Sequence, residues 1–325
     1  MCFNKITNSL IPLDLDLLID KIPELNQLEI NISIVSISEA IDSSNMSPTH
    51  WKEIAEIIDQ QKENFNGFVI IHGTDTMAFT ASALSFMLNG LKKPVILTGA
   101  QLPIGALRND ARENLVTAIE IASLQQNNKA AIQEVCIIFN NFLFRGNRAT
   151  KVHSIHFEAF KSFNYPILAE AGIEIKINHE NLLTPQNEYQ FLSSFDTNIT
   201  IIKLFPGISE ANLQAQLAIP NLKGIVLETY GAGNVPQNEW FINQIKTSIQ
   251  NGIIILNVTQ CAAGGVIPNR YQGSKKLFEA GVINGADMTT EAAITKLMFL
   301  FGNEKNALAV KQKLNQNLVG EITLI

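Results

Sequence analysis

The chain has 325 residues, 17% of them charged and 46% hydrophobic, and a formal net charge of −6. This composition predicts a substantial core, excludes global disorder and argues against a nucleic-acid-binding role. Its three cysteines, at positions 2, 136 and 261, lack metal-ligand spacing, which argues against a disulfide scaffold and a zinc site. No apolar run reaches the roughly 18 residues of a membrane span, and no secretory signal is recognisable, so we expect a cytoplasmic protein.

Short apolar runs alternate with longer helical patterns along the chain. The runs are rich in Val and Ile and cover residues 67–71, 94–98, 134–139, 200–205, 224–229 and 252–258. Such runs are typical of strands buried on both faces of a parallel sheet. Helical patterns cover residues 48–62, 77–91, 110–123, 210–218, 238–251, 275–280 and 289–300. This order predicts an α/β fold with a doubly wound, mostly parallel sheet.

A change of composition predicts two domains. Residues 175–198 are polar and rich in Asn, contain Pro185 and have a weak apolar pattern, which indicates a linker region. We therefore expect a larger N-terminal domain over residues 1–190 and a smaller α/β C-terminal domain over residues 191–325.

The most informative stretch joins the first of these strands to an apolar helix pattern. A strand ending in Gly73-Thr74-Asp75 puts hydroxyls and a carboxylate at the carboxyl edge of a sheet, where open α/β sheets bind ligands. The N-terminus of the following helix adds free N–H groups suited to an anion. Taken alone, however, this turn serves equally well as a simple helix cap.

Two further turns favour a site over a cap. The run at 94–98 ends in Thr98-Gly99-Ala100-Gln101, which is another small polar turn after a buried strand. A third run leads to Gly146-Asn147 and then to Lys151. A lone lysine is usually a solvated surface residue, but after such a turn it could reach inward and lower the pKa of a threonine hydroxyl.

These segments resemble the bacterial type I, cytoplasmic L-asparaginases. The resemblance runs in order over nearly the whole chain, through residues 42–46, 72–86, 94–101, 145–151, 230–234 and 259–261. It implies hydrolysis of L-asparagine to L-aspartate and ammonia by a threonine-dependent amidohydrolase, without metal or cofactor. It also implies a small-molecule substrate, no nucleic-acid or membrane partner, and a homodimer or homotetramer.

The resemblance also implies roles for individual residues. Thr74, Asp75 and Lys151 are the expected catalytic residues, with Thr74 as the hydroxyl of the second of two threonine triads. The expected substrate-binding residues are Asp42, Ser43, Thr74, Asp75 and Ala100. Asp75 is expected to hold the α-ammonium of the substrate and Ser43 its α-carboxylate. An amide substrate needs a nucleophile, a proton relay to the leaving ammonia and donors for the oxyanion, and these residue types supply them.

One segment and two single residues further along the chain stay open. Residues 230–234, Asp287 and Glu291 could line the site or an intimate dimer interface. For Asp287 and Glu291 we favour ordinary capping of the helix that begins near Thr289.

The printed sequence departs from the family at its start. Those enzymes open with an apolar strand and a Thr-Gly-Gly-Thr-Ile-Gly-like turn that carries the first catalytic threonine. Thr7 is the only threonine before Thr49, and it lies in a polar stretch without flanking glycines, so we do not assign it as the nucleophile. We favour a start codon assigned downstream of the true one over a catalytically inactive relative that binds a small amino acid or only self-assembles. In both cases we expect impaired activity of the chain as printed.

Two other expectations concern regulation and function. Some type I enzymes bind a second asparagine as an activator through a basic residue, and Glu228 stands at what looks like that place. Because a carboxylate would repel the carboxylate of the effector, we expect no such activation. A third functional reading is the asparaginase-like subunit of a tRNA-dependent amidotransferase, whose extra N-terminal module has no counterpart in this sequence.

Overall fold

The computed structural model describes residues 2–4, 9–11, 22, 24–25, 28–37, 41–102 and 106–323. Thr7, considered above, lies outside these residues. The chain divides into two compact units, Met1–Phe191 and Leu192–Ile325, and each is described by itself. No described helix has both the length and the apolar character needed to cross a bilayer.

The first unit is built on a six-stranded mixed sheet in the order β12-β11-β8-β7-β4-β3. Its strands are β3 (Phe68–Ile71), β4 (Val95–Thr98), β7 (Val135–Phe139), β8 (Phe142–Arg145), β11 (Ala169–Ala171) and β12 (Ile175–Ile177). The neighbours β3, β4 and β7 are parallel, as predicted, and β4 and β7 are buried at every position. The strands β8, β11 and β12 extend the sheet in antiparallel fashion.

The antiparallel extension begins at a tight hairpin that the sequence analysis missed. Only Asn140 and Asn141 separate β7 from β8, and both have positive φ, 46° and 70°. Asparagine tolerates this left-handed conformation, and two such residues in a row form the turn whose twist matches paired strands. The expectation of a linker over residues 175–198 was also wrong at its start, because β12 and η4 (His179–Asn181) lie there.

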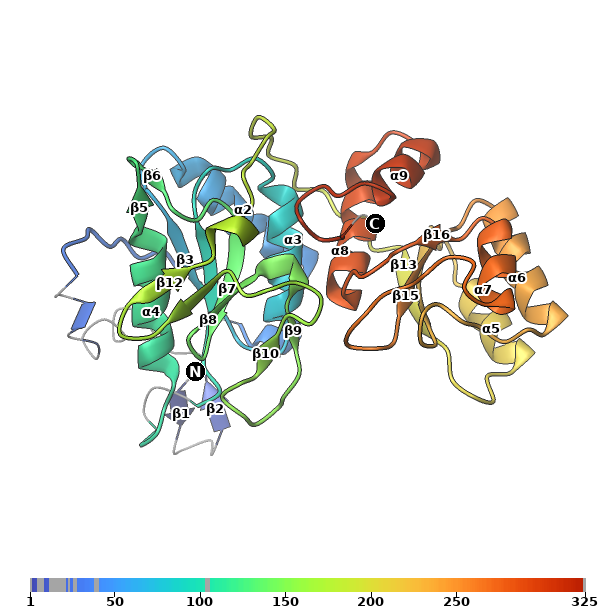
Figure 1. The fold of residues 1–325 in the computed structure, drawn as a ribbon, viewed down its shortest axis with the longest axis horizontal. Helices are drawn as coiled ribbons and strands as arrows, with labels where there is room; N and C mark the ends of the chain where they lie inside the picture. Colours follow the sequence, from blue (N-terminus) through green and yellow to red (C-terminus); the bar gives the residue numbers. More distant parts are fainter. Residues whose placement is uncertain are drawn as a thin grey trace. The chain divides into compact units, whose positions relative to one another are not determined.

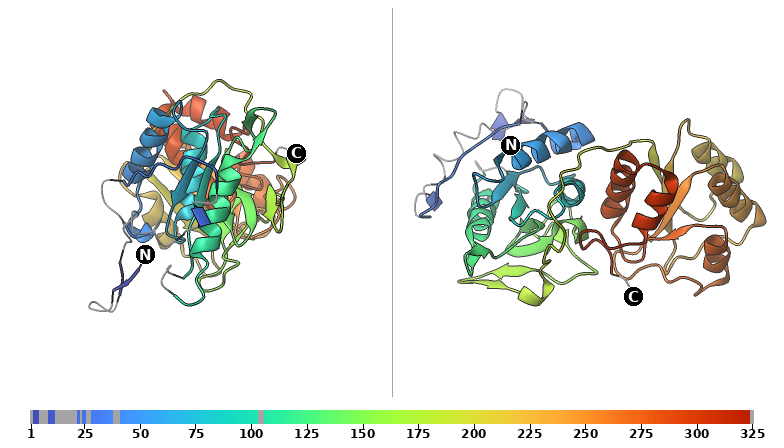
Figure 2. Two further views of the ribbon diagram at one scale, coloured as in Figure 1. Left: turned by 90° about the vertical axis from the view of Figure 1, so that its left-hand side faces the viewer. Right: turned by 90° about the horizontal axis from the view of Figure 1, so that it is seen from above.

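Helices cover both sides of this sheet. Helices α3 (Met77–Met87) and α4 (Ala111–Ser123) lie on opposite sides of it (Figure 1, Figure 2). Helix α4 packs Ala118 and Ile121 onto Ile96 and Cys136 of the sheet. Helix α2 (Pro48–Gln61) contacts α3, and α3 is buried on nearly all sides, as its uniformly apolar sequence predicts.

Short elements complete the first unit. They are β1 (Cys2–Asn4), β2 (Ser9–Ile11), η2 (Ser43–Asn45), β5 (Gln125–Gln126), β6 (Lys129–Ala130), η3 (Gly146–Arg148), β9 (Thr150–Lys151) and β10 (Phe160–Lys161). The pairs β1–β2, β5–β6 and β9–β10 are antiparallel. The last pair positions Lys151.

The second unit contains a four-stranded parallel sheet in the order β13-β14-β15-β16. Its elements are β13 (Ile199–Lys203), α5 (Glu210–Leu217), β14 (Gly224–Thr229), α6 (Glu239–Gln250), β15 (Ile254–Thr259), α7 (Gln272–Glu279), β16 (Ile283–Asn284), α8 (Thr290–Asn303) and α9 (Ala307–Leu314). Helices α5, α6 and α7 cover one face, and α8 covers the other with α9 packed against it (Figure 1). The α/β fold predicted from the sequence is confirmed.

Candidate active site

The predicted site residues gather at the carboxyl ends of β3 and β4 in the first unit. Because these strands are parallel, the turns that follow them meet at one edge of the sheet. The turn after β3 carries Thr74 and Asp75. A Cβ added to Gly73 in that turn would lie 2.5 Å from Ser43 Oγ, and one added to Gly99 after β4 would press on the carbonyl oxygen of His72. The two glycines therefore let the turns pack closely.

Lys151 joins Thr74 and Asp75 in one hydrogen-bonded group. Its Nζ donates to Thr74 Oγ1 at 2.7 Å and to Asp75 Oδ1 at 2.6 Å. The Lys151 side chain is 17% exposed, whereas that of Asp75 is 65% exposed and so remains open to a ligand. The short hairpin of β9 and β10 brings the lysine to this edge from 77 positions along the chain.

The contacts at the start of α3 bear on the capping alternative. Thr76 is the residue before the helix, yet its side chain makes no capping hydrogen bond. Its hydroxyl instead donates to the carbonyl oxygen of Ser43 at 2.7 Å. Asp75 is bonded to Lys151 rather than to the helix N-terminus. Neither residue acts as a simple helix cap.

Ser43 lies against this turn, directly after Asp42 in the chain. Asp42 precedes η2, and its Oδ1 accepts from the main-chain N and from the Oγ of Ser44, both at 3.0 Å. These two hydrogen bonds, the main-chain one first, lower the pKa of the Asp42 carboxyl. Ser43 is buried, and Thr76 ties it to the turn that carries Thr74.

Gln101 belongs to the same group, although the sequence analysis did not select it. Thr74 Oγ1 donates to Gln101 Oε1 at 3.1 Å. The signal was its place in the second polar turn, one position after the predicted Ala100, which is itself half-buried. A glutamine in a loop has many ordinary roles, so residue type alone did not distinguish it.

A buried hydrogen-bonded chain supports the turn from below. His72 Nδ1 lies 2.6 Å from Gly73 O, and Thr80 Oγ1 lies 2.9 Å from His72 Nε2. Trp51 Nε1 donates to Thr80 Oγ1 at 3.0 Å. Burial lowers the pKa of His72, against the smaller opposing effect of the Gly73 carbonyl. The ring is therefore neutral, with its hydrogen on Nδ1 facing that carbonyl, as the network assigns it.

The open positions of the second unit make contacts within that unit. Glu228 Oε1 accepts from Thr290 Oγ1 at 2.5 Å, and Asp287 Oδ1 accepts from Thr323 N at 2.8 Å. Thr289 caps α8 by accepting from Ala292 N. The favoured capping role is thus filled by Thr289, while Asp287 binds the main chain near the C-terminal end.

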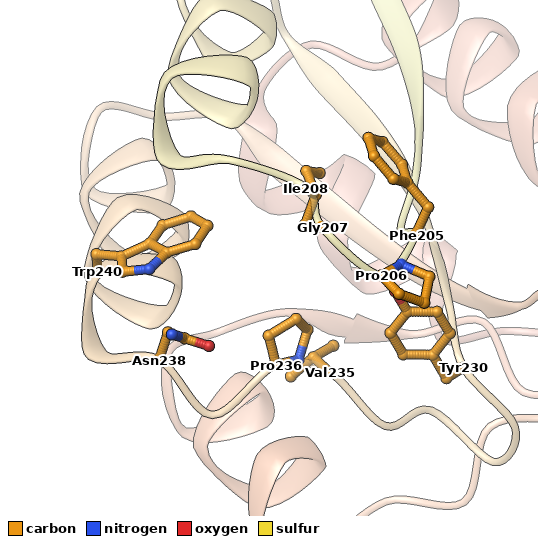
Figure 3. Close-up of a pocket in the computed structure, with 9 residues that line it drawn as sticks. All are labelled: Phe205, Pro206, Gly207, Ile208, Tyr230, Val235, Pro236, Asn238 and Trp240. Carbon is orange, nitrogen blue, oxygen red and sulfur yellow. The ribbon is translucent and has the colours of Figure 1, made fainter.

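The second unit also contains an aromatic hollow of about 320 Å³ (Figure 3). Phe205, Tyr230 and Trp240 surround it, with Pro206 and Pro236 between them, and none of its nine lining residues is charged. A zwitterionic amino acid needs charged partners at both its ends. The hollow therefore does not fit such a ligand, and the charged group around Thr74 does.

Known protein families match both units. The model described as "Asparaginase, N-terminal" matches residues 3–183, and that described as "Glutaminase/Asparaginase C-terminal domain" matches residues 198–314. The chain belongs to the asparaginase family. This confirms the resemblance drawn from the sequence motifs.

Individual members of the asparaginase family are similar over most of the chain. L-asparaginase 1 of Escherichia coli K12 is 42% identical over 303 residues, 93% of this chain and 88% of that protein. The crystal structure of L-asparaginase I from Vibrio cholerae superposes with a TM-score of 0.86 at 41% identity, covering 95% of this chain and 92% of that one. The 60 kDa lysophospholipase of Mus musculus is 42% identical over 295 residues, 90% of this chain but 51% of that protein.

Proposed function

We propose that this chain hydrolyses L-asparagine to L-aspartate and ammonia, with Thr74, Asp75 and Lys151 as its catalytic residues. One observation carries the proposal: Lys151 Nζ contacts both Thr74 Oγ1 and Asp75 Oδ1 at the ligand-binding edge of a parallel sheet. The names of its similar relatives, L-asparaginase in E. coli and in V. cholerae, support the choice of substrate.

The chemistry of this group suits amide hydrolysis. Hydrolysis adds one water to the side-chain amide: a C–O bond forms as the C–N bond breaks, the entering oxygen loses a proton, and the leaving nitrogen gains one to depart as ammonia. Lys151 Nζ donates to the Thr74 hydroxyl, so the two side chains form a path along which a proton can reach the leaving nitrogen. Asp75 holds Lys151 in place and, being largely exposed, offers its carboxylate to the α-ammonium of the substrate. We assign Asp42 and Ser43 to the same backbone end of the substrate, with Ser43 on its α-carboxylate.

Ammonia release from L-asparagine tests the proposal. Thr74→Ala should lower kcat by about 10²- to 10⁴-fold, because it removes the hydroxyl through which the proton passes. Thr74→Ser keeps the hydroxyl and should retain most of the activity. Thr184→Ala is the control, since this exposed threonine accepts a hydrogen bond only through its main-chain oxygen among the contacts described for it. Equal activity of Thr74→Ala and the wild type would refute the assignment.

The alternative is a protein that binds a small amino acid without turning it over. It predicts a rise in Tm with L-asparagine and no ammonia, and the rise should follow RT ln(1 + [L]/Kd). Measuring Tm and ammonia on the same samples separates the two functions.

We also propose a cytoplasmic homodimer or homotetramer, with a small molecule rather than nucleic acid or a membrane as its partner. The net charge of −6 and the resemblance to type I enzymes support this. Light scattering behind size-exclusion chromatography measures the number of subunits directly.

A further inference from the structure

The direction of the Thr74 hydroxyl decides what its oxygen can do. The ammonium of Lys151 has only hydrogens to offer, so at 2.7 Å it occupies one lone pair of Thr74 Oγ1. The hydroxyl hydrogen is then donated to Gln101 Oε1 at 3.1 Å. With the bond to Cβ, three of the four directions around this oxygen are taken, and one lone pair is left for the substrate.

The orientation of the Gln101 amide is itself fixed by the main chain. Its Nε2 donates to His156 O at 2.9 Å and to His153 O at 3.4 Å. Because carbonyl oxygens only accept, the amide nitrogen must face them and the amide oxygen must face Thr74. The main-chain N of Gln101 is held separately, by the carboxylate of Asp110 at 2.9 Å and 3.1 Å.

We propose that Gln101 is a positioning residue for Thr74. Its amide, anchored on the main chain of residues 153–156, holds the Thr74 hydroxyl in the rotamer that meets Lys151 and leaves one lone pair open. This inference rests on the proposed function, because it deepens the role of the same site. The loop at 153–156 thereby becomes part of the support of the site, through its carbonyl groups rather than its side chains.

Two substitutions separate this role from simple packing. Gln101→Met has a similar length but neither an acceptor nor donors, and it should lower kcat about 10-fold with KM within about twofold. Gln101→Glu reproduces the donor and acceptor pattern of the amide only while the introduced carboxyl is protonated. Its activity relative to wild type should therefore be highest at acid pH and fall as the carboxyl ionises, whereas the ratio for Gln101→Met stays flat.

The ionisable groups around this position are present in every variant. Among the described residues they include Lys151, Asp75 and Asp110, together with the rings of His153 and His156, which stack with centroids 4.0 Å apart. Dividing the activity of each variant by that of the wild type at the same pH therefore cancels the effect of the titration of these groups. Gln125 is exposed on β5, so Gln125→Met and Gln125→Glu are matched controls that should leave kcat, KM and the pH profile unchanged.

Crystal structures of the wild type and of Gln101→Met add a readout that needs no activity. We expect the Thr74 hydroxyl to leave Lys151 Nζ in the variant. If it keeps that contact, or if Gln101→Met keeps the wild-type kcat, the positioning role is overturned. If the wild type releases no ammonia but the hydroxyl still moves in the variant, the proposed function fails and the positioning role stands.

Discussion

His72 shows how a single residue under the site links its geometry to pH. The ring lies between the carbonyl that precedes Thr74 and the hydroxyl of Thr80, and it is only 7% exposed. When the ring is neutral, each hydrogen bond from Trp51 through Thr80 to His72 has one donor and one acceptor. Protonation would give Nε2 a hydrogen and turn the Thr80 hydroxyl away from it, so the charged form is disfavoured by burial and by the network together.

We expect the free energy of unfolding to fall in acid because of His72. Its pKa is lowered in the folded chain, so below about 6.5 the unfolded state binds the proton first. The free energy of unfolding has its full value above about pH 6.5 and decreases as the pH falls toward the pKa of His72 in the folded chain. Thermal unfolding of wild type and His72→Asn measures this effect. The difference between their Tm values should become smaller in acid.

The exposed His179 provides the control for that titration. His179→Asn should follow the wild-type Tm at every pH. A gap between wild type and His72→Asn that is constant with pH would contradict the assignment of the acid sensitivity to this ring.

At the scale of elements, the site depends on two strand ends that approach each other. Gly99 follows β4, and a Cβ there would meet the carbonyl oxygen of His72 after β3 as well as Met77 Cε at 2.8 Å. Main-chain atoms of adjoining parallel strands cannot move apart without breaking the ladder between them. The glycine is thus required by the close approach of the two turns.

Gly99→Ala should therefore destabilise the fold by about 1–3 kcal/mol, the usual cost of forcing atoms into a filled space. Urea unfolding gives this free energy. Gly172→Ala is the matched control, because a Cβ there would meet nothing closer than Glu174 O at 3.8 Å. Equal losses in the two variants would show that the approach of the turns is not the cause.

Elements were predictable where a local pattern specifies them. The strand pattern at 224–229 matches β14 at both ends, and the helix pattern at 77–91 starts where α3 starts. The helix stops earlier than predicted, at Met87, and the chain then turns through Gly90 at a φ of 86°. The strands β11 and β12 escaped prediction because they are only three residues long and are half exposed to solvent.

At the scale of the whole molecule, a buried ion pair fastens the last part of the chain to the second unit. Lys296 Nζ on α8 lies 2.6 Å from Glu321 Oε1, and both side chains are 0% exposed. Burial lowers the pKa of Lys296, while Glu321 opposes that shift. The lysine also donates to Gln316 O at 2.6 Å, and the glutamate accepts from Val319 N at 2.8 Å. Each charge is therefore well hydrogen-bonded, although neither side chain reaches the surface.

Removing one partner of this pair should be costly. Glu321→Gln leaves the Lys296 charge buried without its carboxylate, and we expect a loss of about 3–5 kcal/mol. Lys296→Met combined with Glu321→Leu removes both charges and should recover most of that loss. Urea unfolding followed by Trp240 fluorescence, in a Trp51→Phe background, reports on the second unit. A single variant no less stable than the double variant would contradict this account.

The sequence by itself determined the features that depend on residues close together along the chain. Apolar runs predict the buried strands, and the spacing of apolar residues predicts the helices. The residue types of the turn Gly73-Thr74-Asp75 indicate a polar site. The order of these patterns was enough for the α/β fold, and the motifs were enough for the family.

The tertiary structure decided which side chains act together. Thr74 and Lys151 are 77 positions apart, and their contact follows from the β9–β10 hairpin rather than from any feature of either residue. The role of Gln101 and the hydrogen bonds that link Trp51 through Thr80 to His72 could not be predicted for the same reason. The spacing of apolar residues carries information about contacts within one helix or strand. A hydrogen-bonded site joins several elements and forms only when the sheet brings their ends together.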